Sequence, residues 1–271
     1  MVTATQQRRK VTSASVRASK GGEKLTSVTA YDYPTAKIAD AAGVDILLVG
    51  DSLGMVVLGY PDTTKVTLGD ILHHTKAVAR AKPLGLVVAD MPFLSYGVDV
   101  RDTLRNAGRL VQEGGAEAVK LEGGVRVRGE IRAVVDCQIP VMGHVGLTPQ
   151  SVHAFGGYKI QGKSREDADR VLRDAVAVQE AGAFSIVLEG IPAALGERIT
   201  REVDIPTIGI GAGPGCDGQV LVLHDMLGLY PDLRPKFAKV YADVGESAQA
   251  ALERYCREVR EGVFPGPEHS F

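Results

Sequence analysis

Four short apolar runs in this chain each end on a single acidic residue. The runs are rich in Val, Ile and Leu, which is typical of strands buried on both faces in a parallel sheet. Barrels and doubly wound sheets place their chemistry at the carboxyl ends of such strands. The runs cover residues 45–51, 85–90, 118–122 and 184–189, and their final acids are Asp51, Asp90, Glu122 and Glu189. One such acid means little, but four at the same structural position indicate a site that holds a metal ion and a base.

The first three acids, Asp51, Asp90 and Glu122, end successive strands and are therefore expected to cluster on one sector of the rim. Oxygen ligands of this kind suit Mg²⁺, which is commonly held by one or two carboxylates, water and the substrate. No adjacent His or Cys cluster in the sequence favours zinc. Each acid alone is readily explained as the cap of a following helix, but the coincidence of three favours the metal site.

A lysine lies inside the third run, two residues before its final acid. Because side chains alternate across a strand, Lys120 and Glu122 share one face. A lysine inside a buried strand is costly unless it is paired or faces a polar cavity. Lys120 is therefore either a structural salt bridge to a neighbouring strand or a cation that suits a carboxylate-bearing substrate, and the sequence leaves both open.

Two further residues are candidates for proton transfer. Glu189 ends the sixth strand, on the far side of the ring from Asp51, and can act as a general base towards a metal-bound substrate. The alternative is a salt-bridged carboxylate at the rim. His144 follows the fifth strand and is a secondary candidate that could bind substrate, relay a proton or simply order its loop. Ser52 follows Asp51 without a G-x-S-x-G elbow, so a serine nucleophile is rejected.

Strand-like runs alternate with stretches of helical spacing along most of the chain. The expected strands are residues 25–29, 45–50, 85–89, 116–121, 139–143, 184–188, 206–210 and 220–223. The expected helices are residues 35–42, 68–81, 101–113, 125–135, 164–181 and 193–202. This alternation predicts an α/β fold with a parallel sheet and outer helices, and eight strands are what a (β/α)8 TIM barrel needs. The glycine-rich segment 211–219 is too short for a helix, which keeps a doubly wound sheet as the alternative.

The sequence predicts a single catalytic barrel over residues 25–264, with an N-terminal arm at 1–24 and a tail at 265–271. The first 22 residues are basic and lack acids, which is typical of a mobile or loosely docked arm and is also permitted for a transit peptide. Apolar residues at helical spacing after the last strand predict one or two closing helices. Their stripe is explained by packing on the barrel wall, with an oligomer interface as the alternative.

Composition excludes several classes of function. The chain has 271 residues and a net charge of −2, so no global basic field indicates nucleic acid or an anionic membrane. No apolar stretch approaches the roughly 18 residues of a membrane span. The three cysteines, Cys137, Cys216 and Cys256, lie far apart without zinc or redox spacing, and a reducing, cytoplasmic location is expected.

The segments around these residues resemble those of the ketopantoate hydroxymethyltransferases. The similar segments are residues 29–34, 49–55, 89–93, 119–124, 143–150, 155–159, 188–189, 208–213 and 217–219, in order along the chain. The resemblance implies a barrel related to the phosphoenolpyruvate-binding enzymes, of the phosphoenolpyruvate/ketobutyrate type. It also implies Mg²⁺ and transfer of a hydroxymethyl group from 5,10-methylenetetrahydrofolate to 3-methyl-2-oxobutanoate, which gives 2-dehydropantoate for pantothenate and coenzyme A biosynthesis. The family commonly forms decamers, so a homo-oligomer is implied as well.

The resemblance also assigns roles by position. It implies substrate contacts at Asp51, Ser52, Asp90 and Lys120, metal ligands at Asp51, Asp90 and Glu122, and the proton acceptor at Glu189. Glu122 would complete the metal site directly or through water. Gly190 stands where some relatives carry cysteine, which changes the immediate setting of Glu189.

Two other functions compete with this one. A Mg²⁺-dependent carbon–carbon lyase or mutase of the phosphoenolpyruvate-binding type would share the barrel and the acidic site. Such enzymes often use a cysteine on a loop after a barrel strand, and residues 123–128 contain none. A non-catalytic metabolite-binding barrel would be marked by loss of the base or the metal acids, and all are present.

Overall fold

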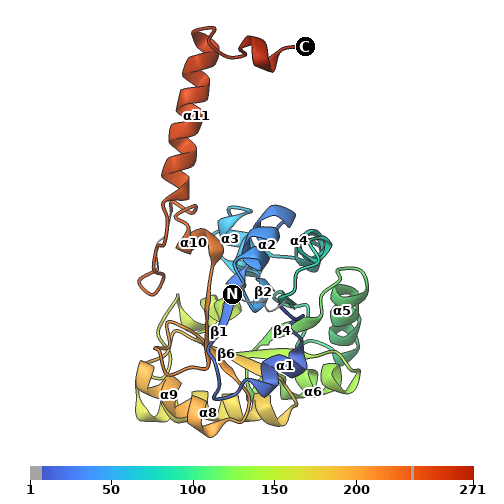
Figure 1. The fold of residues 1–271 in the computed structure, drawn as a ribbon. Helices are drawn as coiled ribbons and strands as arrows, with labels where there is room; N and C mark the ends of the chain where they lie inside the picture. The colour runs from blue at the N-terminus through green and yellow to red at the C-terminus, as the bar shows by residue number, and fades with distance from the viewer. Residues whose placement is uncertain (1–7, 233–234) are drawn as a thin grey trace, which may run out of the picture. The chain divides into compact units, whose positions relative to one another are not determined.

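The chain forms a closed barrel of eight parallel strands, and the computed structural model describes residues 8–232 and 235–271 (Figure 1). Each strand pairs with the next one in sequence, and β8 closes the ring against β1. The strands are β1 (Leu25–Thr29), β2 (Ile46–Val49), β3 (Leu86–Asp90), β4 (Ala118–Glu122), β5 (Val141–Gly146), β6 (Ser185–Glu189), β7 (Thr207–Ile210) and β8 (Gly218–Leu221). The predicted (β/α)8 barrel is confirmed, and the doubly wound alternative is wrong.

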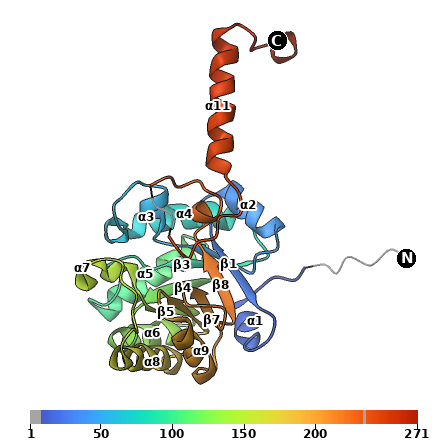
Figure 2. The same cartoon turned by 90° about the vertical axis from the view of Figure 1, so that its left-hand side faces the viewer.

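Helices cover the outside of the ring (Figures 1 and 2). The helices of eight or more residues in the barrel are α2 (Tyr33–Ala41), α4 (Leu68–Arg80), α5 (Val100–Gln112), α6 (Arg128–Asp136), α8 (Arg165–Glu180) and α9 (Ala193–Glu202). Shorter helices and turns are α1 (Ser13–Ala18), α3 (Leu53–Val56), η1 (Thr63–Lys65), η2 (Val125–Val127), η3 (Pro149–Ser151) and α7 (Val152–Phe155). Residues 211–217 between β7 and β8 are all described and contain no helix, as their length predicts.

Local sequence signals begin these helices where the structure has them. Thr67 caps α4 by accepting a hydrogen bond from the Asp70 backbone N–H, and the Asp70 carboxylate accepts one from the Thr67 N–H in return. Ser164 caps α8 through its hydroxyl oxygen, which accepts a hydrogen bond from the Asp167 N–H. Such caps satisfy backbone donors that the first helical turn leaves unpaired.

Alternate strand positions fill the barrel interior. The buried interior cluster is Val16, Ile46, Leu48, Leu86, Val88, Ala118, Met142, Phe184, Val187, Ile208, Ile210 and Val220. Side chains two positions apart on a strand point the same way. On four of the strands, the inward-facing positions nearest the carboxyl end are therefore polar. Those polar residues are Asp90 on β3, Lys120 and Glu122 on β4, His144 on β5 and Glu189 on β6. The period of the strand therefore gives the barrel an apolar floor and a polar top.

The N-terminal arm packs against the barrel from residue 8 onward, which differs from the mobile or loosely docked arm expected from composition. Val16 of α1 is fully buried and belongs to the interior cluster. Three of the basic residues pair with acids of the barrel: Arg8 with Asp40, Lys10 with Glu117 and Lys20 with Asp217. Carboxylates of the barrel therefore balance positive charges of the arm. The composition of the arm alone does not show this docking. Residues 1–7 lie outside the described residues.

The described residues divide into two compact units, the second of which begins at Val222. The second unit contains α10 (Leu223–Met226), the 17-residue α11 (Val244–Arg260) and η4 (Pro267–His269). None of the residues of α11 is buried, and its apolar side chains Leu252, Tyr255 and Val259 are exposed in the single chain. The predicted domain limits at 25 and 264 stay a prediction. None of the helices within residues 8–232 and 235–271 is long and apolar enough to cross a membrane.

Candidate active site

Five of the predicted site residues come together at the carboxyl end of the barrel. Asp51, Asp90, Lys120, Glu122 and His144 are each no more than 6% exposed. Charged groups are rarely buried so deeply unless they are paired or serve a function. The described interior cluster beneath it consists of apolar residues, so these charged groups form a polar site on an apolar layer.

The end of β2 places an acid and a hydroxyl beside Asp90. The backbone N–H of Asp51 donates to Asp90 Oδ2 at 2.9 Å. A Cβ at Gly50 would lie 2.9 Å from Ser52 Oγ and 3.6 Å from Asp90 Oδ2, so glycine allows this close approach. Ser52 Oγ is itself 2.9 Å from the hydroxyl of Tyr31. Ser52 thus lies at the same end of the barrel as the acids, where the resemblance expects a substrate contact.

Lys120 lies at the centre of the charge network. Its Nζ is 3.1 Å from Asp90 Oδ1, 3.8 Å from Glu122 Oε1 and 3.2 Å from His144 Nδ1. Burial alone would lower the pKa of Lys120, but Asp90 and Glu122, with Asp51, outweigh it and raise the pKa. The lysine is therefore a fixed cation. The expected salt bridge to a neighbouring strand is present as the ion pair with Asp90 of β3, and the role towards a substrate carboxylate stays a prediction.

His144 bridges two carboxylates. Its Nδ1 is 3.4 Å from Glu122 Oε1, and its Nε2 is 3.2 Å from Glu189 Oε2. Burial and Lys120 lower the pKa of His144, but Glu122 and Glu189 raise it to about 9. β5 extends to Gly146, so His144 lies within the strand and not in a following loop as expected. Its side chain contacts the candidate base, while its backbone carbonyl accepts from the Gly123 N–H at 2.8 Å and orders that loop.

Glu189 differs from the other acids in its exposure. Its side chain is 14% exposed, against 3% for that of Glu122, so it reaches towards the open end of the site. The Glu189 backbone carbonyl accepts from the Leu147 N–H at 2.8 Å, which fixes the end of β6 beside the β5 loop. Gly190 has φ +55°, and a Cβ there would lie 3.0 Å from the Leu147 side chain. A cysteine at this position would be strained, so glycine suits the backbone of this chain.

Gln150 and Tyr96 complete the network, and neither was predicted as a site residue from the sequence. Gln150 Nε2 donates to Asp51 Oδ2 at 2.8 Å and to Met91 O at 3.0 Å, and its backbone N–H donates to Glu122 Oε2 at 3.1 Å. The Tyr96 hydroxyl donates to Gln150 Oε1 at 2.8 Å and accepts from the Glu122 N–H at 3.0 Å. The pair ties Asp51 to Glu122 across strands far apart in sequence.

The site holds more negative charge than its cations balance. Burial raises the pKa of Asp51 well above its usual range, and repulsion from Glu122 and Asp90 adds to this. Burial likewise raises the pKa of Asp90 in spite of Lys120. Burial also acts on Glu122, but His144 and Lys120 outweigh it and lower the pKa of that carboxyl. Carboxylates held at a raised pKa are stabilised by an added cation.

The residues fit a hard divalent cation better than a soft one. Asp90 Oδ1 and Glu122 Oε1 are buried and accept no hydrogen bond within the described residues, although cations lie near both. Within that same part of the chain, no three His, Cys, Asp or Glu side chains already form a ligand cluster. A cation held by one or two carboxylates, with water and substrate as the other ligands, agrees with both observations and is the usual habit of Mg²⁺.

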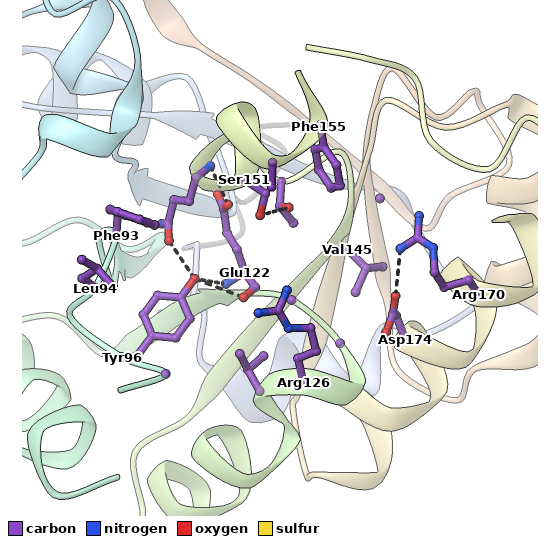
Figure 3. A pocket seen from close by; sticks show the side chains of 18 residues that line it. Phe93, Leu94, Tyr96, Glu122, Arg126, Val145, Ser151, Phe155, Arg170 and Asp174 are labelled. Atoms are coloured by element: carbon purple, nitrogen blue, oxygen red, sulfur yellow. Dashed lines mark hydrogen bonds and ion pairs between the residues drawn. The ribbon is translucent and has the colours of Figure 1, made fainter. Parts of the chain in front are cut away.

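A pocket of about 340 Å³ adjoins the site at Glu122 and Gln150 (Figure 3). Aromatic and aliphatic side chains line part of it, and Arg126 and Arg170 enter it from two different elements. Pockets of this size beside a charged centre commonly bind a small molecule.

Comparison with known proteins decides the family. The family model described as ketopantoate hydroxymethyltransferase matches residues 10–267. The chain belongs to the ketopantoate hydroxymethyltransferase family. The 3-methyl-2-oxobutanoate hydroxymethyltransferase of Moorella thermoacetica is 58% identical over 98% of this chain and 99% of its own length. That of Geobacter sulfurreducens is 61% identical over 92% of this chain and 94% of its own length.

Solved structures with the same fold are more distant. Phosphonopyruvate hydrolase superposes with a TM-score of 0.64 at 15% identity, covering 95% of this chain and 92% of that one. Phosphoenolpyruvate phosphomutase from Streptomyces platensis subsp. rosaceus gives 0.61 at 17% identity, over 93% and 88% of the two chains. A 2,3-dimethylmalate lyase of the PEP mutase/isocitrate lyase superfamily gives 0.60 at 18% identity, over 95% and 87%. These similarities establish the barrel fold that the resemblance implied.

Proposed function

We propose that this chain transfers a hydroxymethyl group from 5,10-methylenetetrahydrofolate to 3-methyl-2-oxobutanoate. The products are 2-dehydropantoate and tetrahydrofolate, which places the reaction in pantothenate and coenzyme A biosynthesis. The observation that carries the proposal is the buried carboxylate–lysine cluster beside the more exposed Glu189, in a chain whose full-length relatives bear this activity in their names.

The keto acid has a carboxylate and a keto oxygen that need positive partners. Asp51 and Asp90, with Glu122 directly or through water, would hold Mg²⁺, which would supply Lewis-acid stabilisation of charge on the keto oxygen. Lys120 balances the negative charge near the substrate carboxylate, and its ion pair with Asp90 fixes its position. Ser52 offers a hydroxyl at the end of β2 for the same substrate.

Glu189 takes the C3 proton of the keto acid. His144 orients this carboxylate through its Nε2, which lies 3.2 Å from Glu189 Oε2. The resulting C3 carbon nucleophile forms a bond to the methylene carbon of the folate as one C–N bond of that carbon breaks. Water then replaces the remaining folate nitrogen on this carbon and leaves the hydroxymethyl group. The two nitrogens take up the C3 proton and a proton from water, which gives tetrahydrofolate. Burial of the surrounding charges keeps bulk water out of the site and strengthens these interactions.

The lyase or mutase alternative draws no support from a specific observation. Its relatives resemble this chain at 15 to 18% identity, which shows the fold alone. Residues 123–128, all described, carry no cysteine. The folate co-substrate and the homo-oligomer remain predictions from the family, and the cytoplasmic location remains a prediction from the spacing of the cysteines.

Product formation tests the proposal directly. The purified protein is incubated with the keto acid, 5,10-methylenetetrahydrofolate and Mg²⁺, and the acid products are identified by mass spectrometry. We expect 2-dehydropantoate, and its loss when Mg²⁺ is chelated or either substrate is left out. Folded protein that forms no such product with all components present would contradict the proposal.

A further inference from the structure

Among the described residues that line the pocket beside Glu122, one cation has no partner. Arg170 Nη1 is 3.5 Å from Asp174 Oδ2, and Arg170 also pairs with Asp167, so its charge is already balanced. Arg126 lines the same pocket, and within residues 8–232 and 235–271 its side chain forms no ion pair or hydrogen bond. Figure 3 shows the Arg126 guanidinium extending into the pocket. An unpaired arginine in a pocket is suited to a ligand carboxylate.

The loop that carries Arg126 is held in place before any ligand binds. The Val125 N–H donates to Asp174 Oδ1 at 3.0 Å, and the Val127 N–H donates to Gly124 O at 3.0 Å. A Cβ at Gly124 would lie only 2.2 Å from the Asp174 Cβ, so this loop packs directly against α8. The arginine is therefore presented from a fixed turn, which lowers the entropy cost of binding.

A second fixed turn supplies an apolar wall to the pocket. Phe93 and Leu94 are 41% and 65% exposed, and both line it. The turn is closed by the Ser95 N–H, which donates to Pro92 O at 2.9 Å, and Asn106 Nδ2 donates to Ser95 O at 2.8 Å. Leu94 has φ +60°, a value usual for glycine or asparagine, so its backbone is strained. This strained residue also keeps an apolar side chain exposed. Strain of this kind is concentrated at ligand sites.

We propose that this pocket binds the p-aminobenzoyl-glutamate part of the one-carbon donor. Arg126 pairs with a carboxylate of the glutamate, while Phe93 and Leu94 pack on the aromatic ring. The inference rests on the proposed function, which needs a folate whose reactive end meets the keto acid. The pocket adjoins Glu122 and Gln150, so a tail lying in it leaves the reactive end beside the carboxylate cluster.

The test is equilibrium binding of two probes, tetrahydrofolate and tetrahydropteroate, which lacks the glutamate. We expect Arg126→Ala to weaken tetrahydrofolate binding by about fivefold or more, the scale of an exposed ion pair, with tetrahydropteroate unaffected. Leu94→Gly should weaken both probes while the melting temperature holds or rises, since glycine adopts the positive φ. Arg128→Ala is the matched control, because Arg128 is an exposed arginine at the start of α6, two residues further on, and does not line the pocket.

Two results would overturn the inference. One is wild-type tetrahydrofolate affinity in Arg126→Ala, and the other is an equal loss for both probes in that variant. Deuterium exchange at C3 of the keto acid, which needs no folate, separates this failure from failure of the proposed function. If Arg126→Ala exchanges the C3 proton at the wild-type rate and binds folate as the wild-type protein does, the folate pocket is wrong and the proposed function stands. Absence of exchange in the folded wild-type protein instead counts against the proposed function.

Discussion

Replacing Gln150 with leucine should cost both stability and metal affinity. The change removes the donors to Asp51 Oδ2 and Met91 O, and the acceptor for the Tyr96 hydroxyl. Two buried acceptors then lose a partner at about 1–3 kcal/mol each, so the free energy of unfolding should fall by about 4 kcal/mol. The Tyr96 hydroxyl keeps an alternative acceptor in the Glu122 carbonyl at 3.1 Å, so it adds little.

Metal affinity should fall for a different reason. Gln150 lowers the pKa of Asp51 through its hydrogen bond, so its loss favours the protonated carboxyl that cannot bind Mg²⁺. Urea unfolding followed by circular dichroism measures the first effect, and titration calorimetry with Mg²⁺ measures the second. The Mg²⁺ deficit should shrink as pH rises, because the Asp51 carboxyl regains its charge.

The matched control is Gln161→Leu. Gln161 is also buried and makes two side-chain hydrogen bonds, to Lys159 O and from Arg170, away from the carboxylates. It should lower stability with Mg²⁺ affinity unchanged. Gln150 does not support Asp51 in this way if Gln150→Leu matches the wild-type protein in both measurements, or if the two leucine variants lose Mg²⁺ affinity equally.

Three further changes probe other parts of the site. Asp90→Asn should abolish most of the Mg²⁺ dependence of keto-acid binding, and calorimetry with unchanged dependence would remove Asp90 from the ligand set. The pKa of His144 is raised to about 9 in the folded chain, so its contribution of about 3 kcal/mol is full below pH 6.5 and is lost as pH rises through about 9. Melting temperatures of the metal-free protein should therefore fall across that range, and fall less in His144→Asn; equal slopes would contradict the assignment. Gly50→Ala should lower the affinity for the keto acid about tenfold or more, a loss of about 1.4 kcal/mol. The new Cβ would lie only 2.9 Å from Ser52 Oγ and should displace that hydroxyl. Binding isotherms like those of the wild-type protein would show that the contact between Ser52 and the keto acid is dispensable.

The strands were predictable because they are buried on both faces. β2 and β3 are continuous apolar runs in the sequence, and the acids at their ends lie at the carboxyl end of the barrel. β5 was harder, because Gly143 and His144 interrupt its apolar run and resemble the start of a loop. The strand continues to Gly146 by pairing with β6, a contact between segments more than forty residues apart. The expected setting of His144 was wrong for this reason.

The hydrogen-bond network around the acids could not be read from the sequence. Gln150 and Asp51 are 99 positions apart, and Tyr96 and Gln150 are 54 apart. No periodicity or spacing links residues so distant, and only the closed ring brings their loops together. By contrast, the pairing of Lys120 with Glu122 follows from strand alternation and was predicted correctly as a shared face.

The most direct test of the account is proton exchange at C3 of 3-methyl-2-oxobutanoate in D₂O with Mg²⁺ and no folate, followed by NMR. Wild-type protein should exchange this proton, and Glu189→Gln should bind the keto acid yet lose the exchange by about a hundredfold or more, since an amide cannot accept the proton. Exchange at an undiminished rate in Glu189→Gln, with the variant folded and saturated, would show that another group is the base.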